Sequence, residues 1–147
     1  RNKGYGLVTF NNQGGIHNGI IDDSDVDIVH NYMLQLLGQA GCPSINGLYY
    51  ATTNLKEDIY AKPNIGMFKR AAAEVGCKWS NGVYVGDKIT DLKAHTKSKA
   101  RPVLVRTGYG NEAEKKLDTF ANKDLKKQTD VYNNLLEFAE ALTDLTG

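Results

Sequence analysis

The sequence predicts an α/β fold in which a parallel sheet carries helices on both faces. Short apolar runs suited to buried strands alternate regularly with amphipathic, helix-like segments along the chain. Strands that alternate with helices form βαβ units, and consecutive units of this kind build one parallel sheet. Because 147 residues is the usual length of one domain, we expect residues 1–147 to form a single domain.

Each element is predicted from a local pattern. Leu7–Phe10 is a β-type apolar run, and the polar, glycine-rich residues Asn11–Gly15 predict a loop after it. Ser24 is expected to cap a helix, and Gly76 to end another that covers about residues 67–75. The apolar stripe of the first helix is expected to be Val26, Val29, Met33, Leu36 and Leu37. Further strands are predicted at 48–51, 83–85 and 103–105, a short helix at 91–97, a solvated Lys-rich surface at 115–127, and a closing helix at 134–145.

Composition excludes several classes of function. The 18 Lys and Arg against 17 Asp and Glu give a net charge of +1, which argues against a general nucleic-acid binder. No apolar run approaches the roughly 18 residues that a transmembrane helix needs. Cys42 and Cys77 lack paired spacing, so we expect two largely buried thiols in a reducing cytoplasm. His17, His30 and His95 also lack the spacing of metal ligands, so no zinc site is expected. We separately expect the protein to be a monomer.

Polar residues cluster where predicted strands end, which is where ligands bind in open parallel sheets. Asp87 and Asp91 follow a strand and are spaced by one helical turn, so their oxygens suit Mg²⁺. The alternative interpretation is an ordinary first helical turn with two acids. Lys62 precedes Pro63 after a polar loop and is able to neutralise a phosphate, although a surface lysine is the simpler interpretation. Asn11–Gly15 offers amides to an anion, or forms a glycine-rich turn.

Taken in order, these segments resemble the haloacid dehalogenase (HAD) superfamily of phosphatases. Asn11 corresponds to the second motif of that family, Lys62 to the third, and Asp87 with Asp91 to the fourth. The resemblance is closest to the capless branch that holds D-glycero-D-manno-heptose 1,7-bisphosphate phosphatase and the histidinol-phosphate phosphatase domain. It extends over almost the whole chain, through Gly4–Ile16, Lys62–Met67, Val85–Leu92 and Pro102–Gly108.

The resemblance implies a Mg²⁺-dependent phosphoric monoester hydrolase of carbohydrate metabolism that acts on a small sugar phosphate. It implies Asp87 as the metal ligand, Lys62, Asn11 and Asp91 as catalytic residues, and Asn12, Gln13 and Lys88 as substrate-binding residues. Three features depart from the family. The hydroxyl of the second motif is an amide here, at Asn11; the Arg that precedes the lysine of the third motif is Ala61; and residues 51–60 lack the Cys and His of a zinc loop, so no structural zinc is expected.

The largest departure is at the start of the chain. The resemblance implies a three-layer α/β/α fold whose first strand carries an Asp-x-Asp motif, with the first Asp as nucleophile and the second as general acid. That strand and the helix after it have no counterpart here, because the chain opens on Arg1 and the acidic run Asp22–Asp25 follows the second motif. We therefore expect the nucleophilic Asp, which would form an aspartyl-phosphate, to lie upstream of these residues.

Two alternatives remain open at this stage. A polynucleotide 3′-phosphatase shares stretches similar to Ala51-Thr52 and to Tyr60–Met67, but Asp91 and Pro102–Gly108 fit the sugar branch better, and a nucleic-acid substrate is not expected. A non-catalytic HAD-fold protein that only binds a phosphorylated ligand is favoured by Asn11 and by the missing nucleophile.

Overall fold

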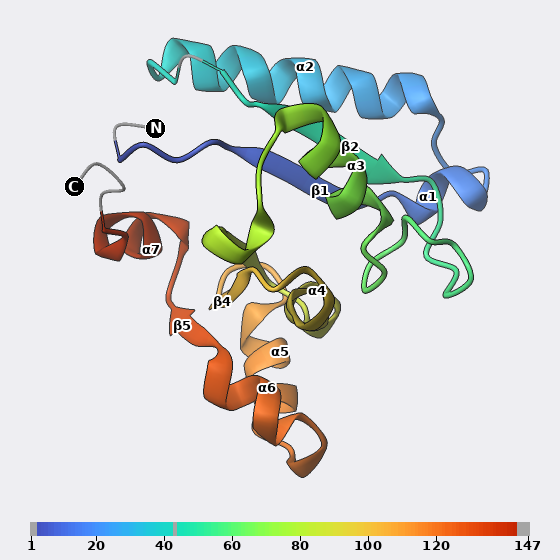
Figure 1. The fold of residues 1–147 in the computed structure, drawn as a ribbon. Helices are drawn as coiled ribbons and strands as arrows, with labels where there is room; N and C mark the ends of the chain where they lie inside the picture. The colour runs from blue at the N-terminus through green and yellow to red at the C-terminus, as the bar shows by residue number, and fades with distance from the viewer. Residues whose placement is uncertain (1–2, 43, 144–147) are drawn as a thin grey trace. The chain divides into compact units, whose positions relative to one another are not determined.

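The computed structural model describes residues 3–42 and 44–143, which form two compact units (Figure 1). The first unit ends at Cys77 and the second spans Lys78–Thr143. The first contains β1 (Val8–Asn12), α1 (Gly14–His17), α2 (Asp23–Gln39), β2 (Gly47–Ala51) and α3 (Gly66–Val75). The second contains η1 (Trp79–Asn81), β3 (Val83–Gly86), α4 (Ile89–Ser98), β4 (Arg101–Val105), α5 (Gly110–Leu117), η2 (Phe120–Asn122), α6 (Lys123–Gln128), β5 (Asp130–Tyr132) and α7 (Leu135–Ala141).

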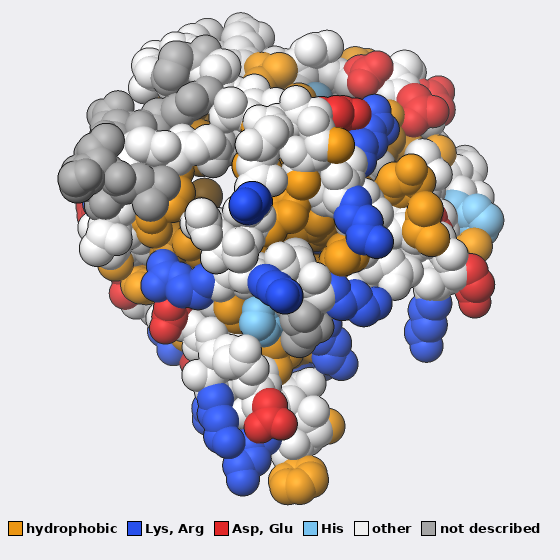
Figure 2. Space-filling model, viewed as in Figure 1, with side chains coloured by type: hydrophobic (Ala, Val, Ile, Leu, Met, Phe, Trp, Pro, Cys, Tyr) orange, Lys and Arg blue, Asp and Glu red, His pale blue; other side chains and the backbone are white. Residues whose placement is uncertain are grey.

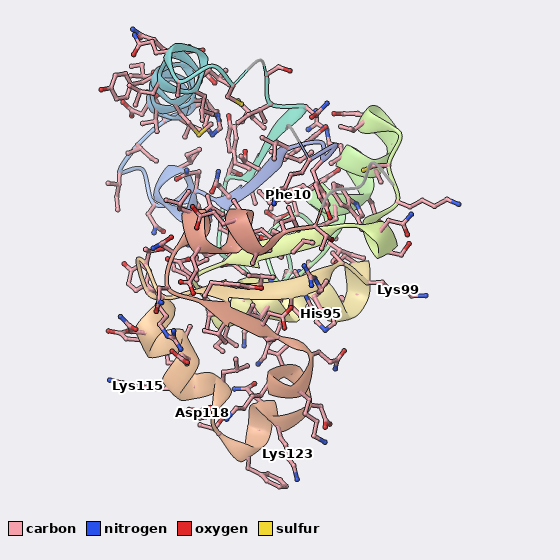
Figure 3. All side chains as sticks on the ribbon, turned by 90° about the vertical axis from the view of Figure 1, so that its left-hand side faces the viewer. Phe10, His95, Lys99, Lys115, Asp118 and Lys123 are labelled. Carbon is pink, nitrogen blue, oxygen red and sulfur yellow. The ribbon has the colours of Figure 1, made fainter. Side chains whose placement is uncertain are left out.

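The first unit is built on a parallel pair of strands. Strand β1 lies beside β2, with Phe10 opposite Tyr49. The Phe10 ring, labelled in Figure 3, stacks on Phe68 of α3 with ring centroids 4.2 Å apart. Met67, Phe68 and Ala71 are buried on one face of α3, and Gly76 ends the helix in the left-handed conformation with φ 71°. The prediction of a helix closed by Gly76 is confirmed, since only glycine adopts that conformation without strain.

The start of α2 differs from the prediction. Asp22, rather than Ser24, is the N-cap, because its carboxylate accepts the backbone N–H of Ser24 at 2.8 Å and of Asp25 at 3.2 Å. Asp25 returns the interaction by accepting the N–H of Asp22 at 3.0 Å. This reciprocal capping box satisfies more of the exposed N–H groups of the first turn than a cap at Ser24 would.

The buried face of α2 also differs from the predicted stripe. Val26 and His30 are buried, Met33 and Leu37 are half-buried, and Val29 and Leu36 are exposed. In Figure 1, α2 runs beside β1 and β2. The side of the helix that meets these strands carries the residues at positions 26, 30, 33 and 37, which are spaced by three or four. Because Val29 and Leu36 share a helical stripe with Met33, periodicity alone did not separate the two faces.

The second unit is a three-stranded parallel sheet in the order β3-β4-β5. Its central strand β4 is buried at every position from Pro102 to Val105, as a continuous apolar run predicts. Val103 lies opposite Val85 on one side and Asp130 on the other. The core of this unit is a cluster of Leu92, Leu104, Ala113, Leu117 and Leu125.

Three expectations about the C-terminal third are corrected. The stretch 115–127 is not only solvated surface, because Leu117 and Leu125 point into the core from α5 and α6. Strand β5 was not predicted, since its three residues are too few for a periodic signal. The closing helix is shorter than predicted and ends at Ala141; residues 144–147, which the prediction included in part, lie outside the described residues.

Parallel strands that alternate with helices confirm the predicted α/β class. None of the helices within residues 3–42 and 44–143 is long and apolar enough to cross a membrane. The cysteines Cys42 and Cys77 are free, as expected, but half-exposed rather than largely buried. Cys42 lies three residues after the end of α2, and Cys77 lies two residues after the end of α3.

Candidate active site

The polar residues singled out in the sequence lie at the carboxyl ends of β1 and β3. Asn11 and Asn12 are the last two residues of β1, not part of the loop that was predicted there. Gln13 follows them, and its backbone N–H donates to the carbonyl of Ala51 at 2.7 Å, which extends the pairing with β2 by one step. Asp87 directly follows the last residue of β3. Each unit therefore presents its own set of polar groups at the carboxyl end of a strand in its own sheet.

In the first unit, Asn12 and Lys62 are joined by two hydrogen bonds. The Asn12 side-chain oxygen accepts the backbone N–H of Lys62 at 2.9 Å, and its amide nitrogen donates to the carbonyl of Lys62 at 3.2 Å. The Lys62 ammonium donates to the carbonyl of Phe10 at 2.8 Å. Lys62 precedes a cis peptide bond to Pro63. The structure thus brings together two predicted site residues that are 50 positions apart.

The amides of Asn11 and Gln13 differ from that of Asn12. Both side chains are half-buried, and within residues 3–42 and 44–143 neither makes a side-chain hydrogen bond. Helix α1, which follows Gln13, has only four residues and gives no helix dipole of consequence. Among the described residues of this stretch, the amides of Asn11 and Gln13 are therefore the side-chain groups still available to an anion.

In the second unit, the carboxylate of Asp87 is held from the β4–α5 loop. Its Oδ2 accepts the backbone N–H of Tyr109 at 3.0 Å. A Cβ on Gly108, whose φ is +61°, would lie 2.3 Å from the same oxygen, so no larger residue allows this approach. One carboxylate oxygen is thereby fixed by the protein, while Oδ1 makes no hydrogen bond among the described residues.

Lys88 lies beside Asp87 and over an aromatic ring. Its Nζ is 4.4 Å from the centroid of the Tyr109 ring, a cation–π contact. Asp87, Lys88, Tyr109 and Lys116 line a cavity of about 230 Å³ together with Glu112. The cavity therefore combines two ammonium groups, those of Lys88 and Lys116, with two carboxylates, those of Asp87 and Glu112.

Asp91 is buried and has a structural function at the start of α4. Its Oδ2 accepts the backbone N–H of Lys88 at 3.1 Å, and its Oδ1 accepts the hydroxyl of Tyr84 at 3.3 Å. Burial, with the nearby Asp91 carboxylate adding to it, raises the pKa of Tyr84 far above its ordinary value, so the hydroxyl remains a donor. Gly86 makes room for this arrangement, since a Cβ there would lie 2.3 Å from the Asp91 Cβ.

The donor chemistry at this edge fits Mg²⁺. Mg²⁺ commonly uses one or two carboxylates and takes its other ligands from water and substrate phosphate. Asp87 offers one such carboxylate, and both oxygens of Asp91 accept protein hydrogen bonds. In the part of the chain that the structure describes, no cluster of three or more His, Cys, Asp or Glu side chains is placed to hold a metal ion by itself. Among the described residues, Asp87 is thus the one of these two acids with a carboxylate oxygen left for a cation.

A larger cavity of about 440 Å³ lies in the first unit, along β2. Tyr50 and Tyr60 line it with Arg70, and the Tyr50 hydroxyl donates to Asp23 at 2.8 Å. None of the predicted site residues lines this cavity. Size alone therefore does not mark the candidate site, whose predicted residues all lie outside this cavity.

Sequence reasoning missed Tyr84 and Tyr109, which hold the acidic residues of this site. Tyr84 lies in the strand before Asp87, where a tyrosine in an otherwise aliphatic run was a weak signal of a buried polar partner. Tyr109 stands between Gly108 and Gly110, and two flanking glycines are typical of close backbone approach, which is the signal that could have found it.

Arg106, in the Pro102–Gly108 segment, holds the C-terminal part of the second unit together. Its guanidinium donates to both oxygens of Glu114, at 2.7 and 2.8 Å, and to Asn133 at 2.8 Å. The hydrogen bond from Arg106 lowers the pKa of Glu114 below its ordinary value of 4.5. Arg106 therefore braces α5 against the segment after β5.

Glu114→Gln tests this brace through the pH dependence of stability. Because the folded-state pKa of Glu114 is lowered, its contribution is present above about pH 4.5 and is lost as the pH falls. The variant is expected to be less stable by about 1 kcal/mol at pH 7, and the difference is expected to be smaller at pH 3. Urea unfolding at both pH values measures the difference. Glu57→Gln, at an exposed position, is the control; an equal loss at both pH values would contradict an ionic contribution.

Comparison with known proteins adds to this geometry. A family model described as HAD-hydrolase-like matches residues 59–138. The chain is 32% identical over 140 residues to D-glycero-beta-D-manno-heptose-1,7-bisphosphate 7-phosphatase of Photorhabdus laumondii, covering 86% of this chain and 74% of that protein. It is 29% identical over 126 residues to D-glycero-D-manno-heptose-1,7-bisphosphate 7-phosphatase of Chlorobaculum tepidum, covering 77% of this chain and 63% of that protein. The chain therefore spans a little less than two thirds of the latter.

The fold is also that of a solved structure. The crystal structure of D,D-heptose 1,7-bisphosphate phosphatase from B. bronchiseptica, complexed with magnesium and phosphate, superposes with a TM-score of 0.80. The two sequences are 23% identical, and the match covers 92% of this chain and 73% of that one.

Parallel strands with charged and amide side chains at their carboxyl ends define the class, an α/β protein with polar groups where ligands bind in open sheets of this kind. Within that class, the chain belongs to the HAD-hydrolase-like family. The resemblance noted in the sequence is thereby confirmed, as is the relation to heptose bisphosphate phosphatases.

Proposed function

We propose that this chain carries the phosphate- and metal-binding part of a Mg²⁺-dependent phosphomonoesterase for a small sugar phosphate such as D-glycero-D-manno-heptose 1,7-bisphosphate. The proposal is carried by one observation in each unit: Lys62 is bonded to Asn12 at the carboxyl end of β1, and Asp87 directly follows β3 and is held by the backbone N–H of Tyr109. The similarity to the heptose phosphatases supports the substrate class. The proposed setting is the cytoplasm, where two free cysteines remain reduced, and the proposed state is a monomer.

In the proposed reaction the chain's own residues bind and orient the transferred phosphoryl group. The Lys62 ammonium stabilises negative charge on its oxygens, and the amides of Asn11 and Gln13 donate to them. Bound Mg²⁺, with Asp87 as a ligand, would offset the repulsion between the phosphate and an attacking carboxylate. That carboxylate, which forms an aspartyl-phosphate, is proposed to come from outside these 147 residues.

The remaining predicted residues have supporting functions in this proposal. Asp91 holds the backbone at Lys88, so that the turn after β3 keeps Asp87 in place. Lys88, stacked on Tyr109, contacts the part of the substrate beyond the reacting phosphate. An amide at Asn11 donates to phosphate as a hydroxyl does, but it has no O–H that could rotate to suit the transition state.

A polynucleotide substrate is less well supported by the surface charges. At the lower end of Figure 2, where α5 and α6 lie, blue and red side chains are interspersed. Lys126 pairs with Asp118 at 2.6 Å, and Lys127 with Asp124 at 3.6 Å. Figure 3 shows Lys115, Asp118 and Lys123 at this end of the second unit. Alternating charges do not form the continuous cationic track that a nucleic-acid backbone requires.

Phosphate release by the full-length protein tests the function. With Mg²⁺ present, heptose 1,7-bisphosphate is expected to be hydrolysed at least about tenfold more efficiently than a 3′-phosphorylated oligonucleotide, because α5 and α6 carry paired opposite charges rather than a continuous cationic track. The reverse preference would assign the polynucleotide reaction instead. If the protein bound the bisphosphate but released no phosphate, the result would favour the alternative of a non-catalytic protein that only binds a phosphorylated ligand.

A further inference from the structure

We propose that Asn12 is a positioning residue that fixes the main chain of Lys62, rather than a ligand of the substrate. This inference rests on the proposed function, in which Lys62 stabilises the charge of the phosphoryl group. It assigns to Asn12 a function different from that of its neighbours Asn11 and Gln13, although all three were predicted from the same stretch of sequence.

The first argument is that the Asn12 amide is already used on both of its sides. Its oxygen accepts from the N–H of Lys62 at 2.9 Å, and its nitrogen donates to the Lys62 carbonyl at 3.2 Å. A primary amide is able to accept and donate in this way, whereas a carboxylate only accepts. The Asn12 amide thus bonds both the N–H and the carbonyl of Lys62, the two main-chain groups that a neighbouring strand would bond.

The second argument is that Lys62 lies in a segment that needs such support. Residues 52–65 contain no helix or strand, and their local bonds include Ala61 N–H to Asp58 and Gly66 N–H to Ile59. Those bonds shape the segment internally, while the two bonds from Asn12 tie it to β1. Strand β1 is rigid in turn, since it pairs with β2 and its Phe10 ring is buried.

The third argument is that β1 also holds the other end of the lysine. The Lys62 ammonium donates to the carbonyl of Phe10 at 2.8 Å, two residues before Asn12. The backbone of Lys62 and its ammonium group are therefore both hydrogen-bonded to the same strand, β1. Such an arrangement limits the rotamers of a long side chain before substrate arrives, which favours reaction because less freedom is lost at the transition state.

The test compares Asn12→Ala, Lys62→Ala and the double variant, in the full-length protein. Asn12→Ala is expected to lower kcat roughly 10- to 100-fold with little change in KM, because Lys62 is displaced and no substrate contact is removed. In the Lys62→Ala background the same substitution is expected to have almost no further effect. Equal losses in both backgrounds would overturn the proposal, since they would mean that Asn12 acts on the substrate independently of Lys62.

Asn46→Ala is the matched control for a general effect on folding. Asn46 also bonds a backbone group with its side chain, the N–H of Leu7 at 2.9 Å, but it lies just before β2, at the opposite end of the strand pair from Asn12. It is expected to leave kcat unchanged. A loss in Asn46→Ala equal to that in Asn12→Ala would show that loss of strand stability, not positioning, explains the result.

Hydrogen exchange at the backbone N–H of Lys62 separates this proposal from the proposed function. Asn12→Ala is expected to speed this exchange at least about tenfold, because the acceptor is removed, and Asn46→Ala is expected to leave it unchanged. If the parent protein released no phosphate from any substrate, the proposed function would fail. The exchange rates would still test the function of Asn12, together with the affinity for inorganic phosphate of Asn12→Ala, Lys62→Ala, the double variant and Asn46→Ala. Unchanged exchange at Lys62 in Asn12→Ala would reject the positioning function. Losses of phosphate affinity that simply add in the double variant would also reject it.

Discussion

Asp87→Asn is expected to lower kcat about 100- to 1000-fold and to remove most of the dependence of the rate on Mg²⁺. The substitution keeps the shape of the side chain and an oxygen for the N–H of Tyr109, which Asp87 binds at 3.0 Å. What it removes is the negative charge, and a neutral amide is a weak ligand for a hard divalent cation. Phosphate release measured over a Mg²⁺ titration gives both values.

The control for this prediction is Asp124→Asn. Asp124 is a surface carboxylate, 91% exposed and paired with Lys127 at 3.6 Å, so its loss changes net charge equally without touching the strand ends. It is expected to retain the parent rate. Equal rates for Asp87→Asn and the parent at every Mg²⁺ concentration would refute the assignment of Asp87 as a metal ligand.

Gly110→Ala is expected to destabilise the second unit by about 3 kcal/mol. Gly110 is buried at the start of α5, and a Cβ there would lie 1.8 Å from the carbonyl oxygen of Val105. Because the obstructing atom is backbone in the central strand, no side-chain rotation relieves the clash. The β4–α5 loop must then move away, and with it the N–H of Tyr109 that holds Asp87. Activity is therefore expected to fall as well.

Urea unfolding measures this effect, with Gly38→Ala as the control. A Cβ on Gly38 meets no atom within 4 Å, and the residue lies in the last turn of α2. Alanine has the higher helix propensity, so the control is expected to be stabilised by up to about 1 kcal/mol. A Gly110→Ala protein as stable as the parent would show that the loop does not approach β4 as closely as described.

The elements that the sequence predicts well are those with a strong local signal. Helix α3 was predicted because its apolar positions repeat at helical spacing and Gly76 follows it, and β4 because its apolar run is continuous. Prediction failed where the segment was too short to show a periodic pattern, or where one apolar residue belonged to two possible helical stripes. Strand β5 has three residues, and in α2 two apolar stripes overlap at Met33, so only packing decides which is buried.

The sequence by itself determined the fold class and the family, because both depend on spacing along the chain, and the candidate site residues stay a prediction from the same spacing. The partners of those residues were decided by the tertiary structure alone. That the Asn12 amide bonds Lys62, that Asp91 accepts from Tyr84, and that Tyr109 holds Asp87 are contacts across 50, 7 and 22 positions. A directional hydrogen bond needs its two groups in line at about 3 Å, and that condition is met only when the strands and loops have packed.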